Sequence, residues 1–234
     1  MMLPWNSAAE RPVPSLRSLP AFLRRAAMVS PRGLARVAGA LYLLIFIVAP
    51  SGASTATPLT LAATLACDTA VALLFYGLFR PVSRDLAMLA LIFRLLFVAT
   101  MSVAGLDYFG ALDLLRSAHS AAAFDTLYRL ALVPFGVHCL LIGYLIYRSG
   151  FMARFLGALM AVAGLTYVNF IYPWLVHFAF PYILIPGGVA EGLLTLWLLA
   201  GAVDGERWAQ RRTERAATRV GMRRPFESDL RRTA

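Results

Sequence analysis

The residues of this sequence that could do chemistry are four ionisable side chains inside long apolar stretches: Asp68, Arg94, His138 and Glu191. Each lies about halfway along its own apolar stretch. On insertion scales, a charged residue at the centre of a bilayer costs about 2.5–3.5 kcal/mol, whereas a Leu or Val gains roughly 0.3–0.6 kcal/mol. We therefore predict that the four side chains face one another inside a helical bundle and avoid the lipid.

The charges of this cluster do not balance. Arg94 can pair fully with only one carboxylate, so the other must be protonated, bind a cation or meet a protonated His138. We predict that Asp68 forms the direct ion pair with Arg94, because the short turn 80–85 makes their helices antiparallel neighbours. Glu191 is then the group that changes protonation or contacts a ligand, since burial without a permanent cation favours its neutral form.

The apolar stretch that carries Glu191 also contains a proline. Pro186 removes a backbone hydrogen bond from a continuous helix, and two glycines follow it directly. A Gly/Pro break near an acid in the middle of the membrane often marks a transporter binding site. Pro134, four residues before His138, is expected to loosen a second helix at a similar depth.

Three interpretations of the cluster stay open. It binds a proton, a cation or a small ligand as part of a carrier or sensor; it belongs to an intramembrane enzyme; or it is a structural network that fixes helix register. Asp68, His138 and Glu191 have the atom types of metal ligands, and a catalytic zinc needs about three protein ligands. The single intramembrane histidine and the competing cation of Arg94 argue against a metal.

Two cysteines adjoin the cluster, Cys67 beside Asp68 and Cys139 beside His138. A buried free cysteine usually behaves as a small hydrophobic residue, and two thiols within a membrane make no disulfide framework. We therefore assign neither thiol a redox role. No serine lies in a nucleophile-elbow motif, so hydrolysis by a Ser-His-Asp triad has no support.

The elements that must position these residues follow from composition. The chain has 234 residues, 60% of them hydrophobic and 15% charged, whereas a soluble domain has roughly 25% charged residues. Its apolar runs are close to the roughly 20 residues that cross a bilayer. Soluble enzymes, disordered chains and disulfide scaffolds are excluded, and an all-α, multi-pass bundle is predicted. The six expected spans are 37–50, 59–79, 86–106, 130–147, 155–174 and 182–203.

These spans define a membrane domain over 34–203, between Arg-rich tails at 1–33 and 204–234. The first span is short and follows arginines, which also fits a cleaved signal peptide; we expect it to be retained. Met28 is an alternative start of the chain. The segment 107–129 is expected to hold an interfacial helix.

The net charge of +10 comes from arginine alone, which supplies all 22 basic residues. Six arginines precede Val37, nine follow Val203, and the turns 80–84 and 148–154 hold two each. Arg116 and Arg129 are the two that lie in segments predicted to be outside. This is the positive-inside pattern, and it predicts a plasma-membrane protein with both termini in the cytoplasm. Topology explains the charge, so the bilayer is the expected partner and nucleic acid is not.

Smaller signals indicate how the helices end and pack. Ser83 is expected to cap a helix that has Asp85 in its first turn, and Gly150 suits the position after a helix end. Stripes of small residues are interpreted as close packing faces; they are Ala62, Ala66 and Ala70, then Gly157, Ala161 and Gly164, then Gly188 and Gly192. The last two flank Glu191 and would also leave room beside it. An aromatic belt is expected from Tyr172, Trp174 and Tyr182 at the outer boundary and Tyr76, Tyr147 and Trp208 at the inner one.

Several short motifs occur at helix ends and in the spans. They are Arg-Val-Ala-Gly-Ala-Leu-Tyr at 36–42, Cys-Asp at 67–68, Arg-Pro-Val-Ser-Arg at 80–84, Gly-Val-His-Cys at 136–139, Tyr-Arg-Ser-Gly-Phe at 147–151 and the stretch 186–191. Together they resemble a family of bacterial membrane proteins known as domain of unknown function 4386. The resemblance runs from about 36 to 203 and leaves out both tails. It implies the membrane fold and no particular activity.

Overall fold

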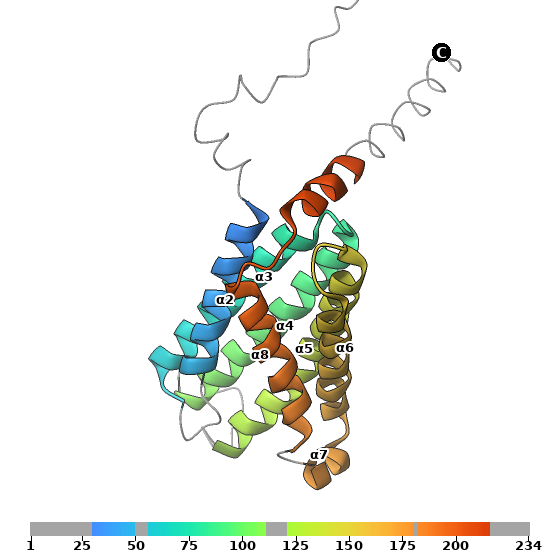
Figure 1. The fold of residues 1–234 in the computed structure, drawn as a ribbon. Helices are drawn as coiled ribbons and strands as arrows, with labels where there is room; N and C mark the ends of the chain where they lie inside the picture. Colours follow the sequence, from blue (N-terminus) through green and yellow to red (C-terminus); the bar gives the residue numbers. More distant parts are fainter. Residues whose placement is uncertain (1–29, 50–55, 111–120, 180–181, 216–234) are drawn as a thin grey trace, which may run out of the picture. The chain divides into compact units, whose positions relative to one another are not determined.

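The computed structural model describes residues 30–49, 56–110, 121–179 and 182–215, and every regular element among them is helical (Figure 1). The main elements are α2 (Pro31–Val48), α3 (Pro58–Phe79), α4 (Arg84–Tyr108), α5 (Ala121–Ser149), α6 (Arg154–Val168) and α8 (Ile185–Leu199). Six helical segments are long and apolar enough to cross a membrane. The prediction of an all-α bundle with six spans is confirmed.

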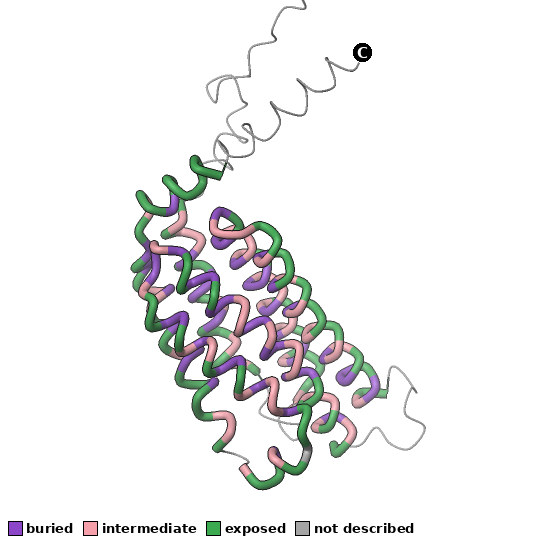
Figure 2. The backbone as a smooth tube through the Cα atoms, turned by 90° about the vertical axis from the view of Figure 1, so that its right-hand side faces the viewer, coloured by how far each residue is buried: buried purple, intermediate pink, exposed green. Residues whose placement is uncertain are grey.

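The six long helices pack as a closed ring in chain order. Each contacts the next, α6 contacts α8 across the short elements between them, and α2 packs on α8 to close the ring. Figure 2 shows buried, intermediate and exposed residues alternating along the helices. This pattern suits helices that turn one face to the interior of the ring and the other to lipid.

The helices run alternately up and down, so their connections gather at two ends (Figure 1). We call the end with the start of α2, the turns 80–83 and 150–153 and residues 200–215 the arginine end, and the opposite one the far end. Of the described arginines, only Arg94 and Arg129 lie away from the arginine end. Those at the arginine end are Arg32, Arg36, Arg80, Arg84, Arg148, Arg154, Arg207, Arg211, Arg212 and Arg215.

Close backbone contact between α5 and α6 explains one of the glycine stripes. A Cβ atom added to Gly157 would lie 2.6 Å from the Gly143 carbonyl oxygen, and one added to Gly164 would lie 2.7 Å from that of Gly136. The packing interpretation of this stripe is therefore confirmed. It is wrong for the Gly188 and Gly192 pair, because a Cβ on either residue would meet nothing within 4 Å.

The alanine stripe on α3 also lies away from helix contacts, since Ala62 and Ala66 are exposed.

Two predicted helix ends are confirmed. The Ser83 side chain accepts a hydrogen bond from the Leu86 N–H and caps α4. Gly150 has φ +73°, the left-handed conformation that ends many helices.

Residues 205–215 form a further helix at the arginine end. Trp208 on this helix is buried, and its indole Nε1–H donates to the Leu78 carbonyl oxygen at 2.8 Å. Arg215 donates in the same way to the Arg80 carbonyl oxygen. The helix thus covers the end of α3 and supplies donors to its last carbonyls. Trp208 was expected in the aromatic belt, but it packs inside the protein instead.

The far end differs from the expectation in three places. Helix α5 begins at Ala121, so the second part of the predicted interfacial segment belongs to a long spanning helix. Residues 111–120 of that segment lie outside the described residues. The fifth span ends earlier than predicted, because α6 is followed by the 3-10 turn Asn169–Ile171 and by the short helix α7 (Pro173–Ala179). The belt residues Tyr172, Trp174 and Tyr182 are exposed at this end.

Pro186 also has a different place from the one predicted. Residues Tyr182–Leu184 form a 3-10 turn, and α8 begins at Ile185. Pro186 is therefore in the first turn of α8, where a backbone N–H has no partner within the helix. The proline starts the helix that carries Glu191 and does not interrupt it.

Candidate ligand-binding site

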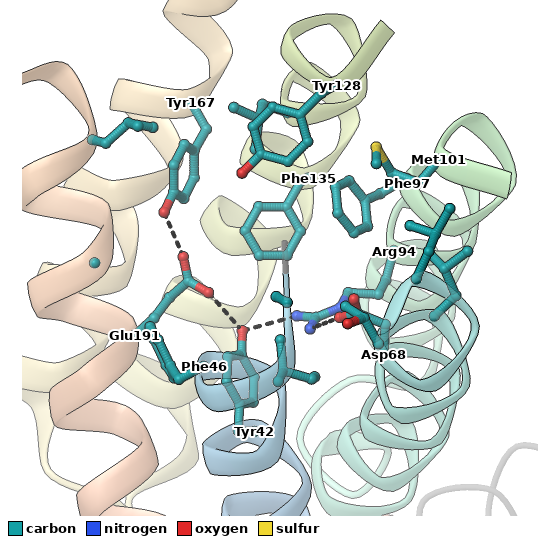
Figure 3. A pocket seen from close by; sticks show the side chains of 18 of the residues that line it. Tyr42, Phe46, Asp68, Arg94, Phe97, Met101, Tyr128, Phe135, Tyr167 and Glu191 are labelled. Carbon is teal, nitrogen blue, oxygen red and sulfur yellow. Dashed lines mark hydrogen bonds and ion pairs between the residues drawn. The ribbon is translucent and has the colours of Figure 1, made fainter. Parts of the chain in front are cut away.

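Arg94 on α4 lies at the centre of a buried polar cluster (Figure 3). Its guanidinium pairs with Asp68 on α3 through Nη2, which confirms the predicted ion pair. Its Nη1–H donates to the hydroxyl of Tyr42 on α2 at 2.9 Å. The guanidinium carbon also lies 4.8 Å from the ring centre of Phe135, so an aromatic face contributes cation–π attraction.

Glu191 is joined to this group through tyrosine hydroxyls. Tyr42 donates to Glu191 Oε2 at 3.1 Å, and Tyr167 on α6 donates to Oε1 at 2.6 Å. Among the described side chains, Glu191 has no ion-pair partner within 4.0 Å. Glu191 thus lacks a directly bound cation, as predicted, and Tyr42 connects it to Arg94.

His138 on α5 contacts the cation and not the second carboxylate. Its Nδ1 lies 2.8 Å from the Ala90 carbonyl oxygen, so Nδ1 must carry the proton that is donated there. Its Nε2 lies 3.4 Å from Arg94 Nη1 and accepts from that N–H. A proton on Nε2 would point at the guanidinium. His138 is therefore a neutral acceptor, and the expected alternative of a protonated His138 beside Glu191 is wrong.

All four predicted side chains point inward, with exposed fractions of 3% for Asp68, 1% for Arg94 and His138, and 8% for Glu191. Sequence reasoning missed the two tyrosines that connect them. Tyr42 stands deep in its span, and a tyrosine away from the membrane boundary is itself a signal of a polar partner. Tyr167 lies near the far end of α6 and gave no such signal.

A cavity of about 290 Å³ reaches this cluster from the far half of the ring. Asp68, Arg94 and Glu191 line its deepest part, and Leu61 and Phe124 line it near the far end. Every one of the six long helices supplies a lining residue. The walls are mostly aliphatic and aromatic, as is usual for small-molecule sites that place a few polar groups in an apolar surface.

The arrangement does not resemble a metal centre. Within the residues that the structure describes, no three His, Cys, Asp or Glu side chains gather closely enough to hold a metal ion. Asp68 is paired with Arg94, and His138 and Glu191 each have other hydrogen-bond partners. Cys139 is fully buried and Cys67 is partly buried, both as free thiols.

The fold and the site define a six-helix membrane protein with a buried Asp–Arg pair at the inner end of a cavity in the far half of the ring. The chain belongs to the family described as domain of unknown function (DUF4386), whose model matches residues 51–201. This match covers α3 to α8 and leaves out α2, which supplies Tyr42.

A curated relative from Archaeoglobus fulgidus is 36% identical over 101 residues. That match covers 43% of this chain and 56% of the relative, which bears the name uncharacterized protein. The chain thus spans just over half the length of the curated relative that it matches. No solved structure matches the chain.

Proposed function

We propose that this protein is a small carrier or sensor of the plasma membrane. It binds a proton together with a small ligand in the cavity that Asp68, Arg94 and Glu191 line. The supporting observation is that the cavity ends on this cluster while the arginine half of the ring is filled. Phe75, Leu78 and Ile146 are among the fully packed side chains of that half. A site open to one side of a membrane suits the capture of a ligand from that side.

The hydrogen bonds suggest how protonation of Glu191 affects Arg94. An ionised Glu191 accepts from both tyrosine hydroxyls. A protonated Glu191 has become a donor on one oxygen, so one of these hydroxyls must turn and accept. Because Tyr42 also accepts from Arg94, its reorientation changes the hydrogen bonding of the Asp68–Arg94 pair. When Tyr42 is the hydroxyl that turns, protonation of Glu191 is coupled to ligand contact at the Arg94 guanidinium.

Infrared spectroscopy of the full chain in nanodiscs tests the proton site, because a protonated carboxylic acid has its own carbonyl band. As the pH is lowered from about 8 to about 5, the wild type is expected to gain this band, and Glu191→Gln is expected to lack it. Glu206→Gln is the matched control, since Glu206 is exposed at the arginine end. A band that persists in Glu191→Gln and disappears in Glu206→Gln would refute the assignment.

Proton flux distinguishes a carrier from a sensor. With the protein in liposomes that enclose a pH-sensitive dye, a carrier collapses an imposed pH gradient, and Glu191→Gln abolishes this activity. A sensor shows the carbonyl band without the flux. If Glu191→Gln keeps the full pH response in both measurements, the cluster is only a structural network.

We also infer that the arginine end faces the cytoplasm, because membrane proteins retain positive segments on that side. Reporter fusions after Val203 and within 148–154 are expected to be cytoplasmic. Fusions within 111–120 are expected to be external. An external reporter after Val203 would refute this orientation.

A further inference from the structure

We propose that the ligand enters the cavity from the lipid, through a side opening between the far halves of α2 and α8, and that it is an uncharged amphiphile with a hydroxyl or carbonyl head. This inference rests on the proposed function, because it names the ligand class and the route of the same site. It goes further in predicting a membrane-dissolved molecule and not a solute taken from water.

The two helices that close the ring do so unevenly along their length. At the arginine end they touch, since a Cβ atom on Gly39 would lie 2.7 Å from the Leu199 backbone nitrogen. At mid-depth they are joined by the hydrogen bond from Tyr42 to Glu191. Towards the far end α2 and α8 diverge (Figure 1). There, a Cβ atom on Gly188 would meet nothing within 4 Å.

Residues on both sides of this gap line the cavity and are exposed at the same time. Phe46 on α2 is 48% exposed, and Ala49 and Gly188 are exposed as well. All three line the cavity. A residue that belongs to both surfaces marks the place where they meet, so these three define the side opening. It lies on the flanks of two spanning helices, where lipid is the surrounding medium.

The chemistry of the cavity selects the ligand. Its walls are apolar and suit a hydrocarbon or ring; they include Leu61, Leu65, Phe97, Met101, Phe124 and Phe135. At its floor, the Nε–H of Arg94 is buried and has no hydrogen-bond acceptor among the described residues. A ligand head that supplies an acceptor would satisfy this donor, which is otherwise buried without a partner.

The charges at the inner end of the cavity further restrict the chemistry of the ligand head group. Asp68 already neutralises Arg94, and Glu191 adds a second carboxylate. A phosphate or carboxylate head would meet these two acids with no spare cation. An ammonium head has no acceptor for the Arg94 Nε–H. A hydroxyl or carbonyl oxygen accepts from Arg94 without bringing charge, and a hydroxyl can also donate to Glu191.

Photolabelling of the full chain in nanodiscs tests both parts of the proposal. The probes are hexadecanol, hexadecanoic acid and butanol, each carrying a diazirine, with adducts located by mass spectrometry. We expect hexadecanol to label peptides that line the cavity and hexadecanoic acid to label them less. Equal or stronger labelling by the acid would overturn the uncharged head group.

Two variants on α8 test the route. Gly188→Phe fills the side opening and is expected to abolish cavity labelling by hexadecanol. Gly192→Phe is the matched control, because Gly192 has equal free space, lies one turn away and does not line the cavity. Ala49→Phe narrows the opening from α2 and gives an independent block. Thermal unfolding of each variant verifies that it is folded.

The remaining outcomes separate this inference from the proposed function. Labelling that survives in both Gly188→Phe and Ala49→Phe overturns the lateral route. Equal loss in Gly192→Phe also overturns it, because this face of α8 then serves another contact, such as a second copy of the chain. Cavity labelling by butanol alone keeps the binding site and overturns the lipid-like ligand. If neither alcohol labels the cavity of the wild type, this inference is overturned, whereas the proposed function is decided by the infrared and flux measurements.

Discussion

The arginine half and the far half of this ring are built from the same six helices but are filled differently. In the arginine half, aromatic and aliphatic side chains stack across the interior; Phe79 lies 6.0 Å from Phe151 and 5.9 Å from Phe75 between ring centres. In the far half, a cavity occupies the corresponding space. Gly143 and Gly157 bring α5 and α6 into backbone contact in the arginine half, whereas Gly188 on α8 leaves free space in the far half.

The difference shows what the buried charges do in this fold. The Asp68–Arg94 pair lies at the boundary of the two halves, where the cavity ends and the packed region begins. A buried ion pair is weak evidence for stability, because desolvation offsets most of its attraction. This pair is almost fully buried, with 1% of the Arg94 side chain and 4% of the Asp68 side chain exposed, and both residues line the cavity. Its position therefore favours a binding role over a purely structural one.

The largest effect is expected from separating the ion pair. Asp68→Asn leaves Arg94 without its direct counter-ion, and loss of one partner of a buried pair costs roughly 3–5 kcal/mol of unfolding free energy. Asp68→Asn combined with Arg94→Gln removes both charges and should recover part of that loss. Unfolding of the single and double variants in nanodiscs measures the coupling between the two residues. Strict additivity of the two substitutions would contradict a direct pair.

A second effect contrasts the packing of the two halves at glycine positions. A Cβ atom on Gly143 would lie 2.7 Å from the Gly157 carbonyl oxygen, so Gly143→Ala must push α5 and α6 apart. Such overpacking costs about 1–3 kcal/mol.

The matched control for this substitution is Gly192→Ala, which adds the same methyl group where nothing lies within 4 Å. It should stabilise its helix by about 0.5–1 kcal/mol, since alanine loses less backbone entropy there. Thermal unfolding of both variants checks the contrast. Equal effects of the two substitutions would contradict the close α5–α6 contact at Gly143.

The sequence predicted the fold well because bilayer insertion imposes a strong and local rule. Six apolar runs had to be spanning helices, and Ser83 and Gly150 already indicated where α4 begins and where α5 ends. Prolines were less informative. Pro186 looks like an interruption in the sequence, but it starts α8 because the preceding residues form a 3-10 turn. Hydropathy does not distinguish these two placements.

The site was predictable to the extent that its residues are charged. The cost of burying a charge in lipid directed Asp68 and Arg94 to each other, whereas nothing similar constrains a tyrosine. Tyr167 reaches Glu191 only because α6 and α8 are neighbours in the ring, and that adjacency comes from packing. The interpretation of Gly188 as a packing residue failed for the same reason, since spacing alone does not tell which helix face has a neighbour.

A third prediction separates the two tyrosines at the boundary. Tyr42→Phe removes a hydroxyl that both accepts from Arg94 and donates to Glu191, so it should cost about 1–2 kcal/mol. Tyr167→Phe removes only the donor to Glu191 and should cost about half as much. In the infrared titration of Glu191, both variants should change the carbonyl band. Only Tyr42→Phe should also change the photolabelling near Arg94, and equal behaviour of the two variants would contradict the linkage through Tyr42.

The smallest effect is expected at the arginine end, where the helix of residues 205–215 covers the packed half. Trp208→Phe keeps most of the buried ring but loses the bond from Nε1 to the Leu78 carbonyl oxygen, at a cost of about 1 kcal/mol. Trp197→Phe is the matched control, because its indole donates to Ala202 at an exposed site where water can replace it. Hydrogen exchange at the end of α3 should quicken in Trp208→Phe and not in Trp197→Phe. Photolabelling of the cavity should stay unchanged in both variants, since the packed half separates Trp208 from the ligand. A loss of labelling in Trp208→Phe would instead mean that the two halves are coupled through the helix ends.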